Sequence, residues 1–305
     1  MRIRTNEGFA ERPKSVKKEK PKYFLIYEGS NTEPKYFEGI MNNKGKLAIS
    51  EQISIVSVLR SLEDLRNSHP KFALKIAQDI KNQSNNNSID KNNFLKFIKD
   101  SILLSNYKDK NNLINIATDY IKNYGNDDIS FSEIDNLVID IYKDSVFDSI
   151  VKDVLDYFNF QKNLLDYNEK TDVINLIVDR DRSSFKDYQY KNLVLSCKEE
   201  GINLYVSNPC FEVWLLMHFD EFDKLDQKKL LENKRVSGRN SKKYTDKMLS
   251  NIIGYDKSNL KFSSFVDRVD AAIKREKNYC EDLDKLENNV GSNVGLLIEK
   301  LKSKF

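Results

Sequence analysis

The sequence has few cysteines and histidines and no long apolar run. Its three cysteines lie far apart without CxxC spacing, which excludes a disulfide scaffold and a zinc ribbon. Its two histidines are too few for a histidine-based metal site. No window of about 18 apolar residues could cross a membrane, and the charged N-terminal segment has no apolar stretch typical of a secretion signal. We therefore expect a cytoplasmic protein with reduced thiols and no membrane partner.

An excess of charge of one sign is also lacking. The 50 basic and 47 acidic residues leave a net charge of +3, so the total does not indicate nucleic-acid binding. Local clusters can still bind phosphates. Residues 1–20 form a basic arm, either a solvated tail or a segment that becomes ordered on phosphates, and residues 225–250 are basic as well. The nucleic-acid contacts predicted in these two segments are Lys18, Lys20, Lys234, Arg235, Arg239, Lys242 and Lys243.

Two short apolar runs near the start of the chain predict buried strands of a parallel sheet. The first covers residues 22–27 and stops at Glu28, and the second covers residues 53–58. Between them, Thr32 suits the N-cap of a helix and Pro34 suits its first turn, where no N–H donor is needed. A strand, a helix and a second strand of this size indicate a βαβ unit.

A different periodicity dominates residues 61–165. Apolar residues recur there at helical spacing, interrupted by an Asn- and Ser-rich linker, and no chemical motif is present. We predict a large helical insertion between strands of the sheet.

The strongest strand pattern covers residues 172–178 and stops at Asp179-Arg180-Asp181-Arg182. A helix is predicted over residues 184–200, because Gly201 suits the position just past a helix end.

Residues 202–206 predict one more strand, after which Ser207-Asn208-Pro209 opens a helix over residues 210–219. Strands that alternate with helices predict an α/β fold with a mainly parallel sheet flanked by helices. The predicted organisation is a basic arm over residues 1–20, a core of residues 21–60 and 166–225, the insertion over 61–165, and a basic helical C-terminal region over 226–305.

Acidic residues follow two of the predicted strands. Glu28 comes after the first strand, and Asp179 and Asp181 come after the strongest one. Ligands of parallel sheets bind at the carboxyl ends of the strands. Carboxylates without a nearby histidine suit Mg²⁺ or Mn²⁺ rather than zinc. A strand followed by DxD is a weak signal alone, and the ordered combination with Glu28 is stronger.

Three blocks of the sequence together resemble one known family. Residues 27–37 (YEGSNTEPKYF) resemble its EGxxTEPxYF opening, residues 178–181 (VDRD) its central DRD motif, and residues 207–219 (SNPCFEVWLLMHF) its SNPCFExWLLxHF block. This is the RloB-like (AbiLii-like) family of phage-defence and restriction-linked proteins. The resemblance covers the chain from about residue 20 to residue 220.

The resemblance implies a Toprim-like, Rossmannoid fold and a metal-dependent nuclease that acts in anti-phage defence or abortive infection. Matched residue by residue, Glu28, Asp179 and Asp181 become the catalytic and metal-binding residues, with Mg²⁺ or Mn²⁺ as cofactor. The substrate is DNA or RNA, with tRNA as one candidate. Because the chain has no P-loop, any ATP-driven step is expected to come from a separate ATPase subunit.

Six further residues are candidates with a plain structural alternative. Glu33 and Glu212 are secondary metal candidates, although the dipole of a first helical turn alone favours an acid. Asn208 is a candidate cap of a phosphate-accepting helix end. The other three are His218, which is a catalytic candidate or packs on a helical face, and Arg180 and Arg182, which contact phosphate or pair with neighbouring carboxylates.

Two other functions remain open from the residues alone. One is a non-catalytic subunit that binds nucleic acid or a partner, in which the acidic site is structural. The other is a DxD sugar-nucleotide transferase, which leaves the block at residues 28–34 unexplained. Convergence of Glu28 with the two aspartates favours the nuclease, whereas a Glu28 that points into the core counts against it.

Overall fold

The computed structural model describes residues 20–58, 70–83, 88–104, 109–130, 132–142, 167–236 and 241–303. Two of the predicted nucleic-acid contacts, Lys18 and Arg239, lie outside these ranges, as do nearly all of the basic arm and parts of the insertion.

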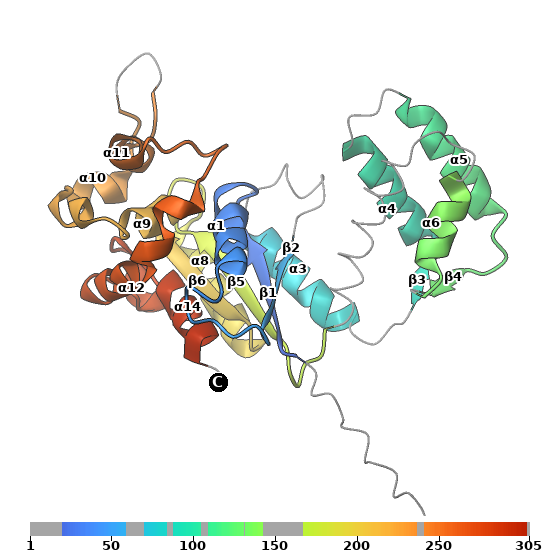
Figure 1. Cartoon of the computed structure of the whole chain (residues 1–305), viewed down its shortest axis with the longest axis horizontal. Coiled ribbons are helices and arrows are strands. Elements are labelled where there is room, and N and C mark those ends of the chain that lie inside the picture. Colours follow the sequence, from blue (N-terminus) through green and yellow to red (C-terminus); the bar gives the residue numbers. More distant parts are fainter. Residues whose placement is uncertain are drawn as a thin grey trace, which may run out of the picture.

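A five-stranded sheet lies at the centre of the protein, in the order β2-β1-β5-β6-β7 (Figure 1). The first four strands are parallel, and β7 pairs antiparallel with β6. The predicted α/β class with a mainly parallel sheet is therefore confirmed. The strands are β1 (Lys22–Tyr27), β2 (Ser54–Val58), β5 (Val173–Asp179), β6 (Asn203–Asn208) and β7 (Gly291–Ser292).

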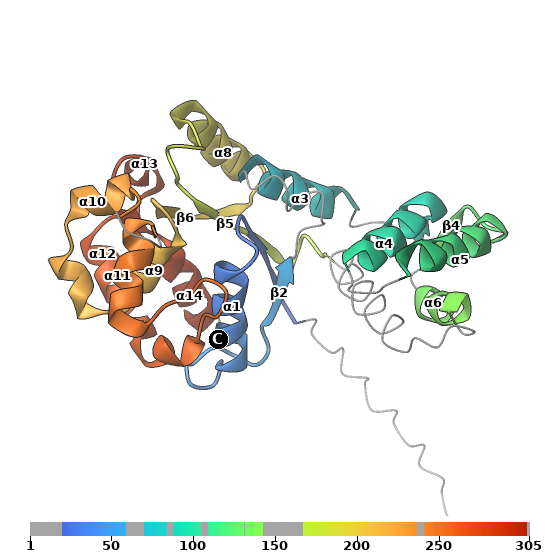
Figure 2. The same cartoon turned by 90° about the horizontal axis from the view of Figure 1, so that it is seen from above.

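Helices cover both faces of the sheet, as Figure 2 shows from above. Side chains alternate along a strand, so Tyr23, Leu25 and Tyr27 of β1 join one buried cluster while Phe24 and Ile26 join another. The first cluster includes residues of α1 (Thr32–Asn42), α9 (Phe211–Leu216), α11 (Tyr244–Ile253), α12 (Val269–Asn278) and α14 (Val294–Ser303). The second includes residues of α3 (Pro70–Gln83) and α8 (Asp187–Glu199).

The region between β2 and β5 contains a helical unit with its own core. Phe94, Ile98, Leu113 and Val138 are among its buried residues, and the strands of the five-stranded sheet contribute none. In both cartoon views this unit lies to one side of the sheet, beyond β2 (Figures 1 and 2). Its elements are β3 (Ser88–Asp90), α4 (Lys91–Leu104), α5 (Lys110–Lys122), β4 (Asp128–Ser130) and α6 (Ile134–Tyr142).

The C-terminal region is part of the same body as the sheet. It contributes β7 and much of the first cluster, including Leu297 and Ile298 of α14. Its remaining short elements are η1 (Asp220–Lys224), α10 (Gln227–Glu232), η2 (Phe262–Ser264), η3 (Val266–Arg268) and α13 (Leu283–Leu286). None of the helices in the described ranges combines the length and the apolar character needed to cross a bilayer.

Two predicted helix starts are wrong. The helix α1 begins at Thr32 itself, and the Thr32 hydroxyl is directed instead to the Tyr255 hydroxyl at 3.1 Å, so it caps nothing. The helix α8 begins at Asp187 rather than near residue 184, because the Asp181 carbonyl accepts the Phe185 N–H in a turn. Gly201, with φ of +67°, ends this helix as predicted.

Candidate active site at the carboxyl ends of the strands

Glu28 and Asp179 meet where β1 and β5 end. The two strands are parallel neighbours. The backbone N–H of Glu28 donates to the carbonyl of Ile177, and the Glu28 carboxylate accepts the backbone N–H of Asp179, both at 2.9 Å. Glu28 is thus held at the carboxyl edge of the sheet beside Asp179 and does not point into the core.

The Asp179 carboxylate lies between β5 and the start of α9. Its Oδ1 accepts the backbone N–H of Phe211, the first residue of that helix, at 2.8 Å. Burial raises the pKa of Asp179 well above its usual range, and the nearby carboxylates of Glu33, Glu28 and Glu212 raise it further. Four carboxylates are therefore close enough to oppose one another's ionisation.

Glu33 approaches the site across a glycine. The backbone N–H of Gly29 donates to Glu33 Oε1 at 3.2 Å. A Cβ atom on residue 29 would lie 2.4 Å from Glu33 Oε2, so a larger residue would displace this carboxylate. Burial, together with the charge of Glu212, raises the pKa of Glu33 to about 7. The glycine that follows Glu28 in the sequence therefore has a specific role, which is to admit Glu33.

Glu212 lies opposite, in the first turn of α9, and has a cationic partner. Lys257 Nζ is 2.8 Å from Glu212 Oε1 and 3.5 Å from Asp246 Oδ1. The Tyr255 hydroxyl donates to Glu212 Oε1 at 3.1 Å. Burial raises the pKa of Glu212, but the charge and hydrogen bond of Lys257, together with further hydrogen bonds, hold this pKa below the usual value. Lys257, Tyr255 and Asp246 were not predicted, because they lie outside every motif and reach the site only through the fold.

Asp181 lies in a different environment from Asp179. Its Oδ1 accepts hydrogen bonds from the backbone N–H and the hydroxyl of Ser183, at 3.0 and 2.6 Å, and its Oδ2 is 3.3 Å from Lys243 Nζ. Burial raises the pKa of Asp181. The Ser183 hydrogen bonds and Lys243 together lower it by more, so the net pKa lies below the usual value. The structure thus groups Glu28, Glu33 and Glu212 around Asp179, and it places Asp181 in the adjoining turn with Lys243.

The two arginines of the DRDR segment differ in burial. Arg180 is fully buried, donates to the Phe185 carbonyl, and pairs with Asp187 at 2.5 Å. The prediction that Arg180 contacts nucleic acid is therefore wrong for this conformation, and the alternative of pairing with a neighbouring carboxylate holds. The Arg182 side chain is 44% exposed and donates to Asn288 Oδ1 at 2.5 Å.

Asn208 and His218 are buried structural residues. Asn208 is the last residue of β6, the N-cap of α9 is Cys210, and the Asn208 amide donates to the Leu286 carbonyl. The prediction that Asn208 caps the helix is therefore wrong. His218 lies among aromatic rings, as the structural alternative predicted, with Nδ1 3.0 Å from the Trp214 carbonyl.

Most of the basic candidates within the described ranges have a hydrogen-bond or ion-pair partner in the protein. Lys20 is exposed. Lys234 pairs with Glu232 at 3.0 Å, and Arg235 donates to the Ser241 carbonyl at 2.7 Å. Lys242 donates to the Ser250 hydroxyl at 2.7 Å. Of these residues, Lys243 is the one that contacts a predicted site residue, through its pair with Asp181.

A comparison with protein-family models finds a match to a model described as "RloB-like protein" over residues 104–301. This range covers about two thirds of the chain and includes Asp179, Asp181 and Glu212. The chain belongs to the RloB-like family. Membership suggests a role associated with defence. Comparisons with the curated proteins and with the solved structures found no match.

The matched range of this RloB-like protein begins after Glu28 and Glu33. The family match therefore does not cover the two glutamates, and their position at the site rests on the contacts of Glu28 with Asp179 and of Glu33 with Gly29. Lys257, in contrast, lies within the matched range.

The chemistry of the four carboxylates fits Mg²⁺ or Mn²⁺. Oxygen donors suit these hard cations, and carboxylates that raise one another's pKa are stabilised by an added positive charge. Their present arrangement is not a finished coordination site, since no group of three or more His, Cys, Asp or Glu side chains in the described ranges is placed to hold a metal. Binding would require carboxylates to exchange existing partners, such as the Lys257 contact of Glu212.

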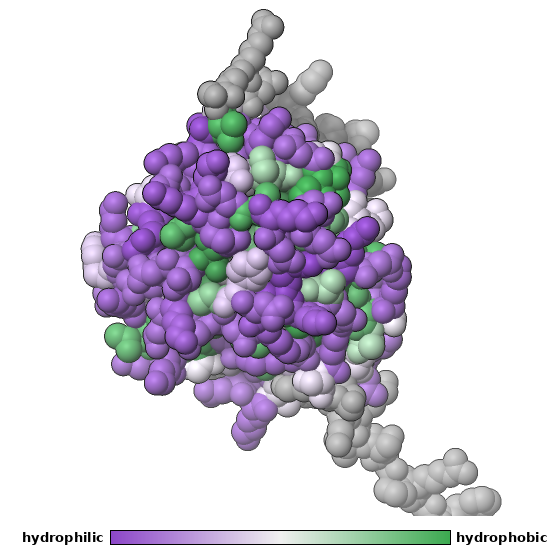
Figure 3. All heavy atoms as spheres, turned by 90° about the vertical axis from the view of Figure 1, so that its left-hand side faces the viewer, coloured by the Kyte–Doolittle hydropathy of each residue, from purple (hydrophilic) through white to green (hydrophobic). Residues whose placement is uncertain are grey.

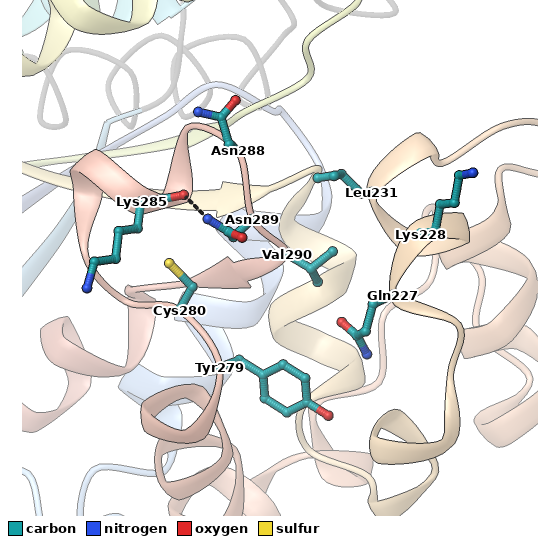
Figure 4. Close-up of a pocket in the computed structure, with 9 residues that line it drawn as sticks. All are labelled: Gln227, Lys228, Leu231, Tyr279, Cys280, Lys285, Asn288, Asn289 and Val290. Carbon is teal, nitrogen blue, oxygen red and sulfur yellow. Dashed lines mark hydrogen bonds between the residues drawn. The ribbon is translucent and has the colours of Figure 1, made fainter.

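A separate hollow lies in the C-terminal region of this RloB-like protein. Its volume is about 530 Å³. Figure 4 shows Lys228 and Lys285 at opposite sides of it, and Asn289 donating to the Lys285 carbonyl. None of the four carboxylates lines it, but Asn288 does, and Asn288 is the partner of Arg182. The hollow is therefore adjacent to the turn that carries Asp181.

Proposed function

We propose that this RloB-like protein is a metal-dependent endonuclease that hydrolyses phosphodiester bonds of DNA or RNA in anti-phage defence. The observation that carries the proposal is the partly buried Asp179 carboxylate beside Glu28, with Glu33 and Glu212 close enough to raise its pKa, at the carboxyl ends of β1, β5 and β6. A DRD segment joined to a glutamate after the first strand is also the arrangement implied by the resemblance to Toprim domains.

The division of roles follows from each environment. Asp179 and Glu28 would hold Mg²⁺ or Mn²⁺, with Glu212 as a further ligand and Asp181 recruited if it releases Lys243. The cation supplies polarisation of a phosphoryl oxygen and lowers the pKa of the attacking water. Glu33 suits proton transfer, because a group with a pKa of about 7 is near the optimum for general acid–base catalysis at neutral pH.

The positive side chains would act on the phosphate. In hydrolysis the water oxygen bonds to phosphorus, the bond to one ester oxygen breaks, and that oxygen takes up a proton. The Lys257 ammonium, whose side chain is 52% exposed, lies beside Glu212 and is placed to offset charge that develops on the phosphate oxygens. Lys243 lies beside Asp181 and would orient the nucleic-acid strand through its phosphates.

A cleavage assay tests the proposal. The protein is incubated with single-stranded DNA, duplex DNA or tRNA in the presence of Mg²⁺, Mn²⁺ or EDTA, and the Asp179→Ala/Asp181→Ala and Asp179→Asn variants are run beside it. We expect metal-dependent cutting of at least one substrate, lost in both variants and retained in Glu221→Gln, which changes an exposed carboxylate of η1. Metal binding is measured in parallel by calorimetry.

One observation favours a second function. The carboxylates of Asp179 and Glu212 are already engaged by Phe211 N–H and by Lys257, which is also what a structural acidic cluster requires. In that case the chain is a non-catalytic subunit that binds nucleic acid or a partner. Absence of both cutting and metal binding supports this function. Metal binding without cutting supports a nuclease that acts only with a separate ATPase subunit, and adding that subunit is then the decisive assay.

A further inference from the structure

An exposed aromatic ring lies next to the turn that carries Asp181. Tyr188, in the first turn of α8, is 66% exposed, more than the other exposed large hydrophobic residues of the described ranges. Together with Arg182, Lys186 and Asp187, it lines a hollow of about 500 Å³. A tyrosine ring in such a position offers a flat apolar surface to a ligand.

The charge of this hollow is positive despite the presence of Asp187. The Asp187 carboxylate is 2.5 Å from Arg180 Nη2 and 3.7 Å from Arg182 Nη2. The hydrogen bond from Arg180 lowers the pKa of Asp187, and the charge of Arg182 adds to this, so the carboxylate is ionised and its charge is balanced. Lys186, whose ammonium donates to the Ser183 carbonyl at 3.3 Å, and Arg182, whose guanidinium donates to Asn288, are both exposed, and each carries a positive charge that an anion can approach.

The backbone beside Tyr188 is held by contacts of the buried Arg180 and by a hydrogen bond at the start of α8. The Arg180 guanidinium lies 4.8 Å from the centre of the Tyr190 ring and donates to the Phe185 carbonyl. The Lys186 N–H donates to Gln189 Oε1 at 2.8 Å and closes the start of α8. The ring and the two cations therefore project from a firmly held turn, which lowers the entropy cost of binding.

This hollow adjoins the one in Figure 4. Arg182 lines the first and Asn288 lines the second, and the hydrogen bond between them joins the two at their boundary. Lys228 and Lys285 extend the line of positive side chains into the second hollow. Figure 3 shows the face on the left-hand side of Figure 1, which is mostly hydrophilic with separate apolar patches.

We propose that Tyr188, Arg182 and Lys186 form a subsite for an unpaired nucleotide of a single-stranded nucleic acid, with its base stacked on Tyr188 and its phosphates on the two cations. The inference rests on the proposed nuclease function and names its substrate class. Every base has a π-face, so stacking on an aromatic ring is tolerant of sequence. A base inside a duplex is already stacked on its neighbours and cannot occupy this ring.

A binding experiment without cutting tests the subsite. Fluorescence anisotropy is recorded on labelled single-stranded DNA, single-stranded RNA and duplex DNA with EDTA present. We expect Tyr188→Ala to weaken single-strand binding about 5–100-fold, Tyr188→Phe to stay within about twofold of the wild type, and duplex binding to stay unchanged. Arg182→Gln and Lys186→Gln should each reduce the slope of log K against log salt by about 0.7 for single strands.

The matched control is Leu195→Ala, an exposed apolar side chain on the same helix seven residues further on, about 10 Å along the axis. Circular dichroism confirms that each variant is folded. Equal single-strand affinity of Tyr188→Ala and the wild type overturns the subsite. The exposed ring of Tyr188 would then be a candidate contact for a protein partner. Equal losses on single strands and duplex also overturn it. A Tyr188-dependent single-strand affinity in a protein that neither cuts nor binds metal supports the subsite and contradicts the nuclease proposal alone.

Discussion

The carboxylate of Glu28 accepts the backbone N–H of Asp179 at 2.9 Å, which joins two residues 151 positions apart in the chain. The contact exists because β1 and β5 are adjacent parallel strands that end at the same edge of the sheet. The contact brings the negative charge of Glu28 to the backbone of Asp179, whose own carboxylate has a raised pKa.

Glu28→Gln removes the negative charge of residue 28 but keeps an acceptor for the Asp179 N–H. The amide oxygen can still accept the Asp179 N–H, whereas the negative charge is gone, so the pKa of Asp179 should fall towards its usual range. We expect the free energy of unfolding to change by less than about 1 kcal/mol and cleavage to fall by about 100-fold or more. Urea unfolding and initial cleavage rates measure the two effects. Glu38→Gln, an exposed carboxylate of α1, is the control, and equal cleavage by both variants contradicts a role for Glu28.

Gly29→Ala displaces Glu33 without removing its charge. The added Cβ would lie 2.4–2.8 Å from the Glu33 carboxyl atoms, which must swing away. Only the end of a flexible side chain has to move, so we expect stability to fall by less than about 1 kcal/mol while cleavage falls about tenfold or more. Gly45→Ala, where an added Cβ meets nothing within 4 Å, is the matched control. Undiminished cleavage by Gly29→Ala would remove Glu33 from the catalytic residues.

Lys257→Met removes the cation beside Glu212. Glu212 is only 4% exposed, so the loss leaves a buried carboxylate without its partner, and its pKa should rise. Because the Lys257 side chain is half-exposed, we expect a loss of about 1–2 kcal/mol at neutral pH, below the range for fully buried pairs. The Glu212→Gln/Lys257→Met double variant should recover most of it. Additive losses in this double-mutant cycle would mean that the pair is not coupled.

Local patterns were sufficient to predict four of the strands, β1, β2, β5 and β6. Residues 22–27 form β1 as predicted, because an apolar run between turn residues has few alternatives. The two-residue strand β7 has no such signal, since its pairing with Ser207 and Asn208 comes from packing of the C-terminal region. The start of α1 was misplaced by one residue because Thr32 bonds to Tyr255, 223 residues away.

The candidate site was predictable only in part for the same reason. The ends of β1 and β5 indicated Glu28 and Asp179, whose contact the structure supplies. Glu33 and Glu212 were secondary candidates because a first-turn acid has a sufficient local explanation in the helix dipole. Only the fold brings both close enough to raise the pKa of Asp179. Lys257 has no local signal. Whether Asp181 binds a metal stays a prediction.

The buried His218 predicts how stability depends on pH. Its Nδ1 faces the Trp214 carbonyl and therefore carries the proton, so the neutral Nε2 accepts the Tyr36 hydroxyl at 3.0 Å. Burial, to which the charges of Arg275 and Arg268 add, lowers the pKa of His218 from 6.5 to about 3. Between pH 6.5 and pH 3 His218 is therefore protonated in the unfolded chain but stays neutral in the folded protein. His218 thus makes the free energy of unfolding fall as the pH falls.

His218→Gln tests this dependence, because glutamine keeps an acceptor for Tyr36 and does not titrate. Urea unfolding at a series of pH values gives the free energy of unfolding of both proteins, and their difference isolates His218 from the many carboxylates. From pH 6.5 to pH 5 the wild type should lose about 1.5 kcal/mol more than the variant. Parallel curves over this interval would mean that His218 titrates alike in the folded and unfolded states, and that the aromatic cluster around it is open to water.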